Sequence, residues 1–187
     1  MKTLILKPGG FLMMIGLFLI SLNGSSQDNK LTKEELREAR KTQQLMNFQS
    51  LDTLLENKCF VLEADYLENQ YGNRIPVLSN LNFIMLDSLK AVLQTGTSSR
   101  AGTNGVGGAT AEGTITGLKI VKNQKNLSYF LRFSVSTDIG MYDVAMNIFS
   151  NNHATATITG LTRGKLVYDG RILALYNSSV YKGRNTI

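Results

Sequence analysis

The chain has 187 residues, a formal net charge of +6, one cysteine and one histidine. A single cysteine excludes an internal disulfide, and one cysteine with one histidine leaves too few nitrogen and sulfur ligands for a zinc site. The basic excess is small and no cluster of Lys or Arg follows one periodic face, so we expect no nucleic-acid partner.

Residues 1–26 have the pattern of a cleavable export signal. Two lysines make the start basic, residues 11–20 are apolar apart from one glycine, and residues 21–26 are small or polar apart from Leu22. The apolar run is shorter than the roughly 20 residues of a membrane-spanning helix. We predict cleavage just before Gln27 and a periplasmic or extracellular location. Because Cys59 is too far along the chain for a lipid anchor, no stable membrane attachment is expected after cleavage.

Residues 27–58 are predicted to form an N-terminal helical extension. Thr32 and Glu35 match a capping box, in which Thr32 begins the helix and Glu35 reaches back to its backbone. The first half is charged, so we expect it to be exposed or frayed. The second half has apolar residues suited to covering one end or face of a sheet: Leu45, Met46, Leu51, Leu54 and Leu55.

Between Cys59 and Tyr176 the hydrophobic pattern has a period of two residues, which is typical of strands. On the first strand, Phe60, Leu62 and Ala64 are predicted to share the core face with Tyr66. The other strands are expected at two places within 82–94 and at 114–122, 127–137, 141–150, 153–159 and 165–175.

These strands predict a mainly β domain over residues 59–176. Sequential strands joined by short turns usually pair, and an open sheet would leave unpaired edges. We therefore expect a small antiparallel barrel or a two-layer sandwich of about seven or eight strands, preceded by one N-terminal helix. Residues 177–187 are predicted to be a loose polar tail.

Residues 95–108 form a glycine-rich segment with little to bury. A phosphate-binding loop would lead into a helix, whereas residues 110–117 have the pattern of a strand, and the lysine of such a loop is missing. We interpret the segment as a flexible hairpin loop or a lid, and expect that shortening Gly102–Gly108 would cost little stability if it is only a flexible loop.

Four side chains are candidates for chemistry, and each has a simpler interpretation. Cys59 is predicted to be a buried hydrophobe rather than a nucleophile. His153 follows a turn, where an exposed polar residue is ordinary. Glu63 and Asp65 share a strand face and can approach the separation of about 5–5.5 Å used by retaining glycosidases, but a solvated face is favoured. We assign no catalytic, cofactor-binding or metal residue and expect no cofactor.

Four segments together resemble a family of exported proteins from Bacteroidota, a domain of unknown function. They are CFVLEAD at 59–65, GGATAEGTITGLKIVKNQKNLSYFLRFSV at 107–135, YDVAMNIFSNNHATATITG at 142–160 and GKLVYDGRIL at 164–173. The resemblance implies an exported, mostly antiparallel β domain after an N-terminal helix. It implies no activity and no site residue.

The sequence favours a non-catalytic binding or interaction domain. Its partner is predicted to be a small apolar ligand held by the barrel or an envelope protein docked on the sheet. A periplasmic hydrolase using carboxylates and a structural envelope protein are the alternatives. Oligomeric state is not predicted.

Overall fold

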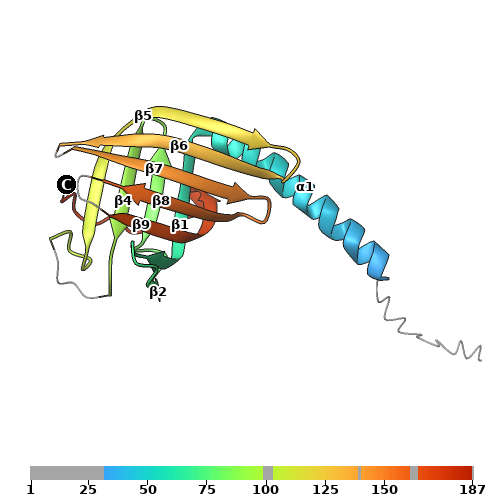
Figure 1. Ribbon diagram of the computed structural model, residues 1–187, viewed down its shortest axis with the longest axis horizontal. Coiled ribbons are helices and arrows are strands. Elements are labelled where there is room, and N and C mark those ends of the chain that lie inside the picture. The colour runs from blue at the N-terminus through green and yellow to red at the C-terminus, as the bar shows by residue number, and fades with distance from the viewer. Residues whose placement is uncertain (1–31, 99–102, 139, 161–163, 187) are drawn as a thin grey trace, which may run out of the picture.

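The computed structural model describes residues 32–98, 103–138, 140–160 and 164–186, so the predicted export signal and its cleavage site lie outside the described residues. Within these ranges the chain forms one α-helix, nine strands and one short 3-10 helix (Figure 1). In chain order they are α1 Lys33–Asn57, β1 Cys59–Glu68, β2 Arg74–Pro76, β3 Phe83–Asp87, β4 Lys90–Thr95, β5 Ala109–Asn123, β6 Ser128–Thr137, β7 Gly140–Phe149, β8 His153–Thr159, β9 Lys165–Ala174 and η1 Leu175–Asn177.

Eight strands of the described chain close into an antiparallel barrel. β1 pairs with β3, the strands from β3 to β9 pair in chain order, and β9 pairs back with β1. A side chain at Gly170 would clash with the backbone of Glu63, so glycine permits β9 and β1 to approach where the barrel closes. The short β2 adds to the far end of β1. The predicted mainly β fold after one helix is confirmed, as a barrel rather than a sandwich.

Side chains from all eight strands converge inside the barrel. On β6, Leu131, Phe133 and Val135 are at most 1% exposed, while Phe130 and Arg132 between them face outward. β7 repeats the alternation with Val144, Met146 and Ile148. Burying one such side chain stabilises the fold by roughly 1.5–3 kcal/mol. The period-two pattern therefore specifies the core face of these strands.

The predicted core face of β1 is wrong at Tyr66. Leu62 and Ala64 are fully buried, but the pairing of β1 with β9 shifts between Ala64 and Tyr66, which marks a β-bulge. The Tyr66 side chain is 40% exposed, and the Arg74 guanidinium lies 4.1 Å from the centre of its ring. Beyond the bulge, Leu67 rather than Tyr66 is buried in the barrel core.

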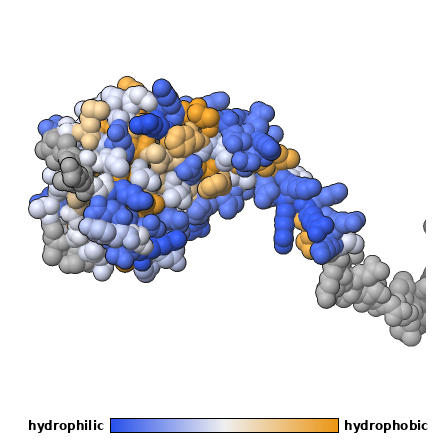
Figure 2. Space-filling model, viewed as in Figure 1, coloured by the Kyte–Doolittle hydropathy of each residue, from blue (hydrophilic) through white to orange (hydrophobic). Residues whose placement is uncertain are grey.

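α1 covers one end of the barrel with its C-terminal half only. Phe48, Leu51 and Leu55 join the barrel core, whereas the N-terminal half projects away from the barrel and has a mostly hydrophilic surface (Figures 1 and 2). Leu45 and Met46 were expected to cover the sheet but are 50% and 58% exposed. Within the described ranges, no helix is both long and apolar enough to cross a membrane.

The expected loose tail is wrong, because residues 178–186 are fixed along the barrel. Backbone amides of this segment donate to Asn80 and Thr110 and to the Gln94 side chain. Val180 packs against a small apolar cluster outside the main core, formed by Val61, Phe83 and Val92. We call residues 178–186 the C-terminal strap.

The glycine-rich segment is also more ordered than predicted over residues 103–108, while residues 99–102 lie outside the described part of the chain. The Asn104 side chain is 1% exposed and donates hydrogen bonds to Thr95 and Thr110. Its oxygen accepts hydrogen bonds from the amides of Val106 and Gly108. Shortening the segment would break these bonds, so the expectation of a small stability loss is reversed.

Candidate functional site

A polar contact fixes α1 against the barrel. The Tyr129 hydroxyl donates to Asp52 Oδ1 over 2.5 Å, and Lys122 Nζ lies 2.5 Å from Asp52 Oδ2. The rings of Phe48 and Tyr129 pack beside this contact with centroids 4.8 Å apart. Because Lys122 and Tyr129 belong to β5 and β6, this hairpin sets the position of the helix.

The contact favours the ionised form of Asp52. Partial burial opposes ionisation, but hydrogen bonds from Lys122 and Tyr129, together with the Lys122 charge, outweigh it and hold the pKa of Asp52 below its ordinary value. Burial, reinforced by the bond to Asp52, raises the pKa of the Tyr129 hydroxyl. The ionised Asp52 carboxylate therefore accepts the hydrogen bond that the protonated Tyr129 hydroxyl donates.

Asp52→Asn should destabilise the protein at neutral pH, and the difference from wild type should vanish in acid. A carboxyl whose folded pKa is lowered stabilises the fold above its unfolded pKa of about 3.9, and this stability is lost as the pH falls through the folded pKa. Urea unfolding from pH 7 down to about pH 2.5 measures the difference. Glu38→Gln, in the exposed half of α1, is the control and should match wild type throughout. A constant difference for Asp52→Asn at every pH would contradict the ionised contact.

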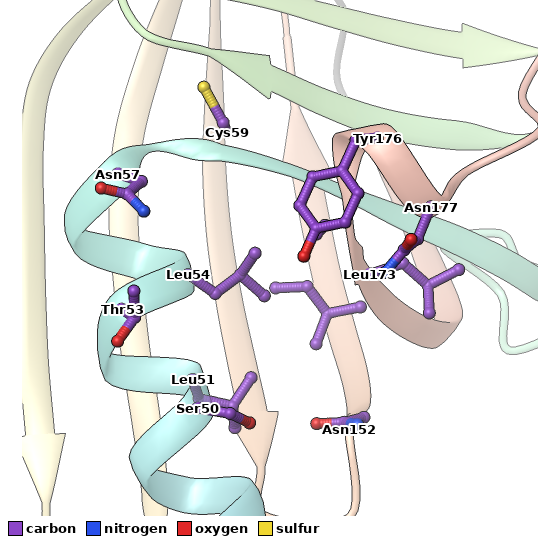
Figure 3. Close-up of a pocket in the computed structure, with 12 residues that line it drawn as sticks. Ser50, Leu51, Thr53, Leu54, Asn57, Cys59, Asn152, Leu173, Tyr176 and Asn177 are labelled. Atoms are coloured by element: carbon purple, nitrogen blue, oxygen red, sulfur yellow. The ribbon is translucent and has the colours of Figure 1, made fainter.

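The docked half of α1 leaves an open groove between itself, β9 and η1 (Figure 3). The groove has a volume of about 830 Å³. The buried side chains Leu51 and Ile172 are part of its lining, and Leu54 extends from α1 in front of β9 (Figure 3). Tyr176, on η1, is 88% exposed and extends its ring toward the same space. The lining residues are Ser50, Leu51, Thr53, Leu54, Asn57, Cys59, Asn152, Ile172, Leu173, Ala174, Tyr176 and Asn177.

The groove combines apolar side chains with neutral hydrogen-bonding groups. Among the described residues that line it, none is charged. The amides of Asn57, Asn152 and Asn177 lie around the groove, and within the described part of the chain these side chains have no hydrogen-bond partner. Asn152 occupies the β7–β8 turn with φ of 62°, a conformation that asparagine tolerates better than most residues. Among its described lining residues the titratable groups are the Cys59 thiol and the Tyr176 hydroxyl, and there is no carboxylate, imidazole, ammonium or guanidinium group.

Of the residues considered as candidates from the sequence, Cys59 alone lines this groove. It is half-buried rather than fully buried as expected, and its thiol lies 3.6 Å from Asp87 Oδ1. Glu63 accepts a 2.5 Å hydrogen bond from Ser178 of the C-terminal strap. Within the described ranges, no group of three or more His, Cys, Asp or Glu side chains is placed to hold a metal ion.

His153 lies at the start of β8, on the outer face of the sheet. Its Nε2 is 3.2 Å from Asp169 Oδ1, which also pairs with Arg74 at 3.1 Å. The side chain is 39% exposed, and its ring stacks on Phe149 with centroids 6.1 Å apart. These contacts are those of a surface residue beside the ion pair of Arg74 and Asp169.

Comparison with known proteins now places the chain in a family. The family described as "Domain of unknown function (DUF4251)" matches residues 42–172. The chain belongs to the DUF4251 family. A crystal structure of a DUF4251 family protein from Bacteroides eggerthii is similar, with a TM-score of 0.60 and 25% identity over 71% of this chain and 91% of that chain. A search of curated proteins finds no match. The resemblance to a domain of unknown function is thus confirmed.

The segment matched by DUF4251 supplies only part of the groove. It contains the residues from α1 and β1 as well as Asn152 and Ile172, but ends before Tyr176 and Asn177. Sequence reasoning missed Tyr176, Asn177 and Asn152 as site residues. Each stands in a turn or near a strand end, and only folding brings them beside α1.

Proposed function

We propose that this DUF4251 protein is an exported, non-catalytic binding domain and that its binding surface is the groove between α1, β9 and η1. The observation that carries the proposal is the composition of the groove. Leu54 and Leu173 offer apolar contact, while neutral amides around them offer hydrogen bonds that no other described residue takes up. A concave, mainly apolar surface with a few convergent polar groups is typical of small-molecule sites.

The groove is favoured over the barrel interior as the binding surface. Inside the barrel, Leu62, Phe133 and Met146 are at most 1% exposed and pack together with residues from the other strands. A ligand there would have to displace these side chains, at the energetic cost of opening a packed core. The groove is already open on the outside of the fold.

The lining of the groove favours binding over hydrolysis. The carboxylates that we considered for a hydrolase, Glu63 and Asp65, are not among its lining residues, and Glu63 is held by Ser178. General acid–base chemistry needs a titratable group within reach of the substrate. The described side chains that meet in the groove are amides, aliphatic hydroxyls, aliphatic groups, the Cys59 thiol and the Tyr176 phenol, so the carboxylate pair or imidazole that most hydrolases use is missing from this lining.

Export is supported by the sequence of residues 1–26, with its basic start, its apolar run over 11–20 and its small residues before Gln27. The proposed location is therefore periplasmic or extracellular, after cleavage before Gln27. A groove on such a domain would meet molecules of the cell envelope or the medium.

Native mass spectrometry of the protein expressed as the full chain in its own host tests the proposal. The wild type should carry an additional mass, either a small molecule or a partner chain. Thr53→Trp places a bulky ring at the exposed groove side of α1 and should abolish that mass. Gln49→Trp, also exposed on α1 but outside the groove lining, is the matched control and should retain it.

Two results would overturn the groove as the binding surface. One is a bare chain for the wild type and both variants. The other is an additional mass that all three proteins carry equally. The same spectra give the mass of the exported polypeptide, and a chain that retains residues 1–26 would contradict the predicted cleavage.

A further inference from the structure

We infer that the groove takes a neutral, polyhydroxylated ligand, a short segment of an oligosaccharide. This inference rests on the proposed binding function and adds the chemical class of the occupant. Three features of the groove carry it: the lack of charge in its described lining, its unpaired amides and its exposed aromatic ring.

The uncharged lining disfavours an ionic occupant. Charged residues of α1 lie close by, including Asp52 and Glu56, yet neither is among the lining residues. An anion or cation entering the groove would lose water without meeting an opposite charge, which is unfavourable. A neutral molecule avoids that loss.

The unpaired amides disfavour a purely apolar occupant. Each of Asn57, Asn152 and Asn177 presents an NH₂ group and a carbonyl oxygen, so each can both donate and accept. An apolar molecule would cover these groups without replacing their bonds to water, whereas sugar hydroxyls donate and accept in the same way. Three such amides around one groove suit a ligand with several hydroxyls.

Tyr176 adds a flat surface for a sugar ring. Its side chain is 88% exposed and extends toward the space between Leu54 and Leu173 (Figure 3). A tyrosine offers an apolar face with a polar hydroxyl at its tip, which suits a molecule that is apolar on one face and polar at its edges. Leu54 and Leu173 extend this apolar contact.

The sheet beside the groove disfavours an extended peptide. Peptides that join a sheet need an unpaired strand edge. β9, which borders the groove, is paired with β8 on one side and with β1 on the other. The pairing with β8 ends at Arg171, and the Ile172 amide donates to the Asn152 carbonyl. The stretch of β9 beyond these contacts, Leu173–Ala174, is too short to add a peptide strand, so recognition in the groove falls to side chains.

Fragmentation of the mass retained by the host-purified wild type tests the inference first. Release of neutral sugar residues is the expected result. A retained lipid, peptide or acidic molecule that Thr53→Trp abolishes would overturn the inference while leaving the proposed binding function intact. Absence of any retained mass would overturn both.

Calorimetric titration of the same protein with maltohexaose, cellohexaose and hexagalacturonate tests it independently. At least one neutral hexasaccharide should bind, and at least tenfold more tightly than the acidic one. Tyr176→Ala should weaken that binding at least tenfold. Tyr71→Ala, which removes a side chain that is 80% exposed and outside the groove lining, should leave it unchanged. Tighter binding of hexagalacturonate, or no binding of either neutral probe, would overturn the inference.

Discussion

Replacing Leu62 by aspartate should abolish folding. The Leu62 side chain is fully buried on β1, inside the barrel, where it joins the main apolar core. An aspartate there would leave a cavity and bury a carboxyl group that has no partner, a combination expected to exceed about 4 kcal/mol. Since small domains are stable by only about 5–15 kcal/mol, little folded protein should remain. Circular dichroism and solubility of the purified variant measure the effect.

Val121→Asp is the matched control for Leu62→Asp. Val121 lies on β5 and is 58% exposed, so the same substitution introduces the carboxyl group into solvent. This variant should fold with nearly wild-type stability. A soluble Leu62→Asp protein with native circular dichroism would contradict the assignment of Leu62 to the barrel interior, since a one-residue change of register exchanges the two faces of a strand.

Gln94→Leu should destabilise the protein by about 3 kcal/mol or more. The Gln94 amide group is fully buried and donates to the carbonyls of Leu81 and Tyr181. Its oxygen accepts from the Thr110 hydroxyl and the Gly183 amide. Leucine has a similar side-chain volume but cannot form hydrogen bonds, so the two carbonyls, the hydroxyl and the backbone amide each lose their bond to Gln94. Each buried polar group left unsatisfied costs about 1–3 kcal/mol. Urea unfolding measures the loss.

Gln49→Leu provides the control for Gln94→Leu, because Gln49 is exposed on α1. Its stability should match that of the wild type. Amide hydrogen exchange should also show earlier exchange at Tyr181 and Gly183 in Gln94→Leu, since the strap loses its central attachment. Equal stability of Gln94→Leu and wild type would mean that the strap is held by other contacts.

Local patterns in the sequence predict most of the barrel. The turn between β3 and β4 falls at Ser88, with φ of 58°, next to the predicted Asp87–Ser88 junction. The alternation on β6 and β7 correctly predicts which side chains enter the core. These features depend on neighbouring residues alone. The bulge before Tyr66 was missed because a single extra residue leaves the preceding alternation unchanged.

Contacts between distant parts of the chain account for the errors in the loop and the tail. Polar composition suggested that both segments were loose, yet Gly183 bonds to Gln94, and the Arg184 amide bonds to the carbonyl of Asn104. Polar side chains can be buried when every hydrogen bond is satisfied. Nothing in the local sequence around Asn104 or Gln94 identifies partners so far along the chain.

The candidate groove was not predictable for the same reason. Thr53 and Asn57 appear as ordinary exposed helix residues, and Tyr176 appears as the end of a strand. The groove exists because the contact of Asp52 with Lys122 and Tyr129 sets α1 at one end of the barrel, beside β9. Its lining therefore depends on tertiary packing rather than on a motif.

A crystal structure of the protein purified gently from its own host is the most direct test of the groove as the binding surface. We predict ordered non-protein density between α1 and η1, in contact with Leu54, Leu173 and Tyr176. Ligand density inside the barrel or on another face, with only water between α1 and η1, would contradict this account.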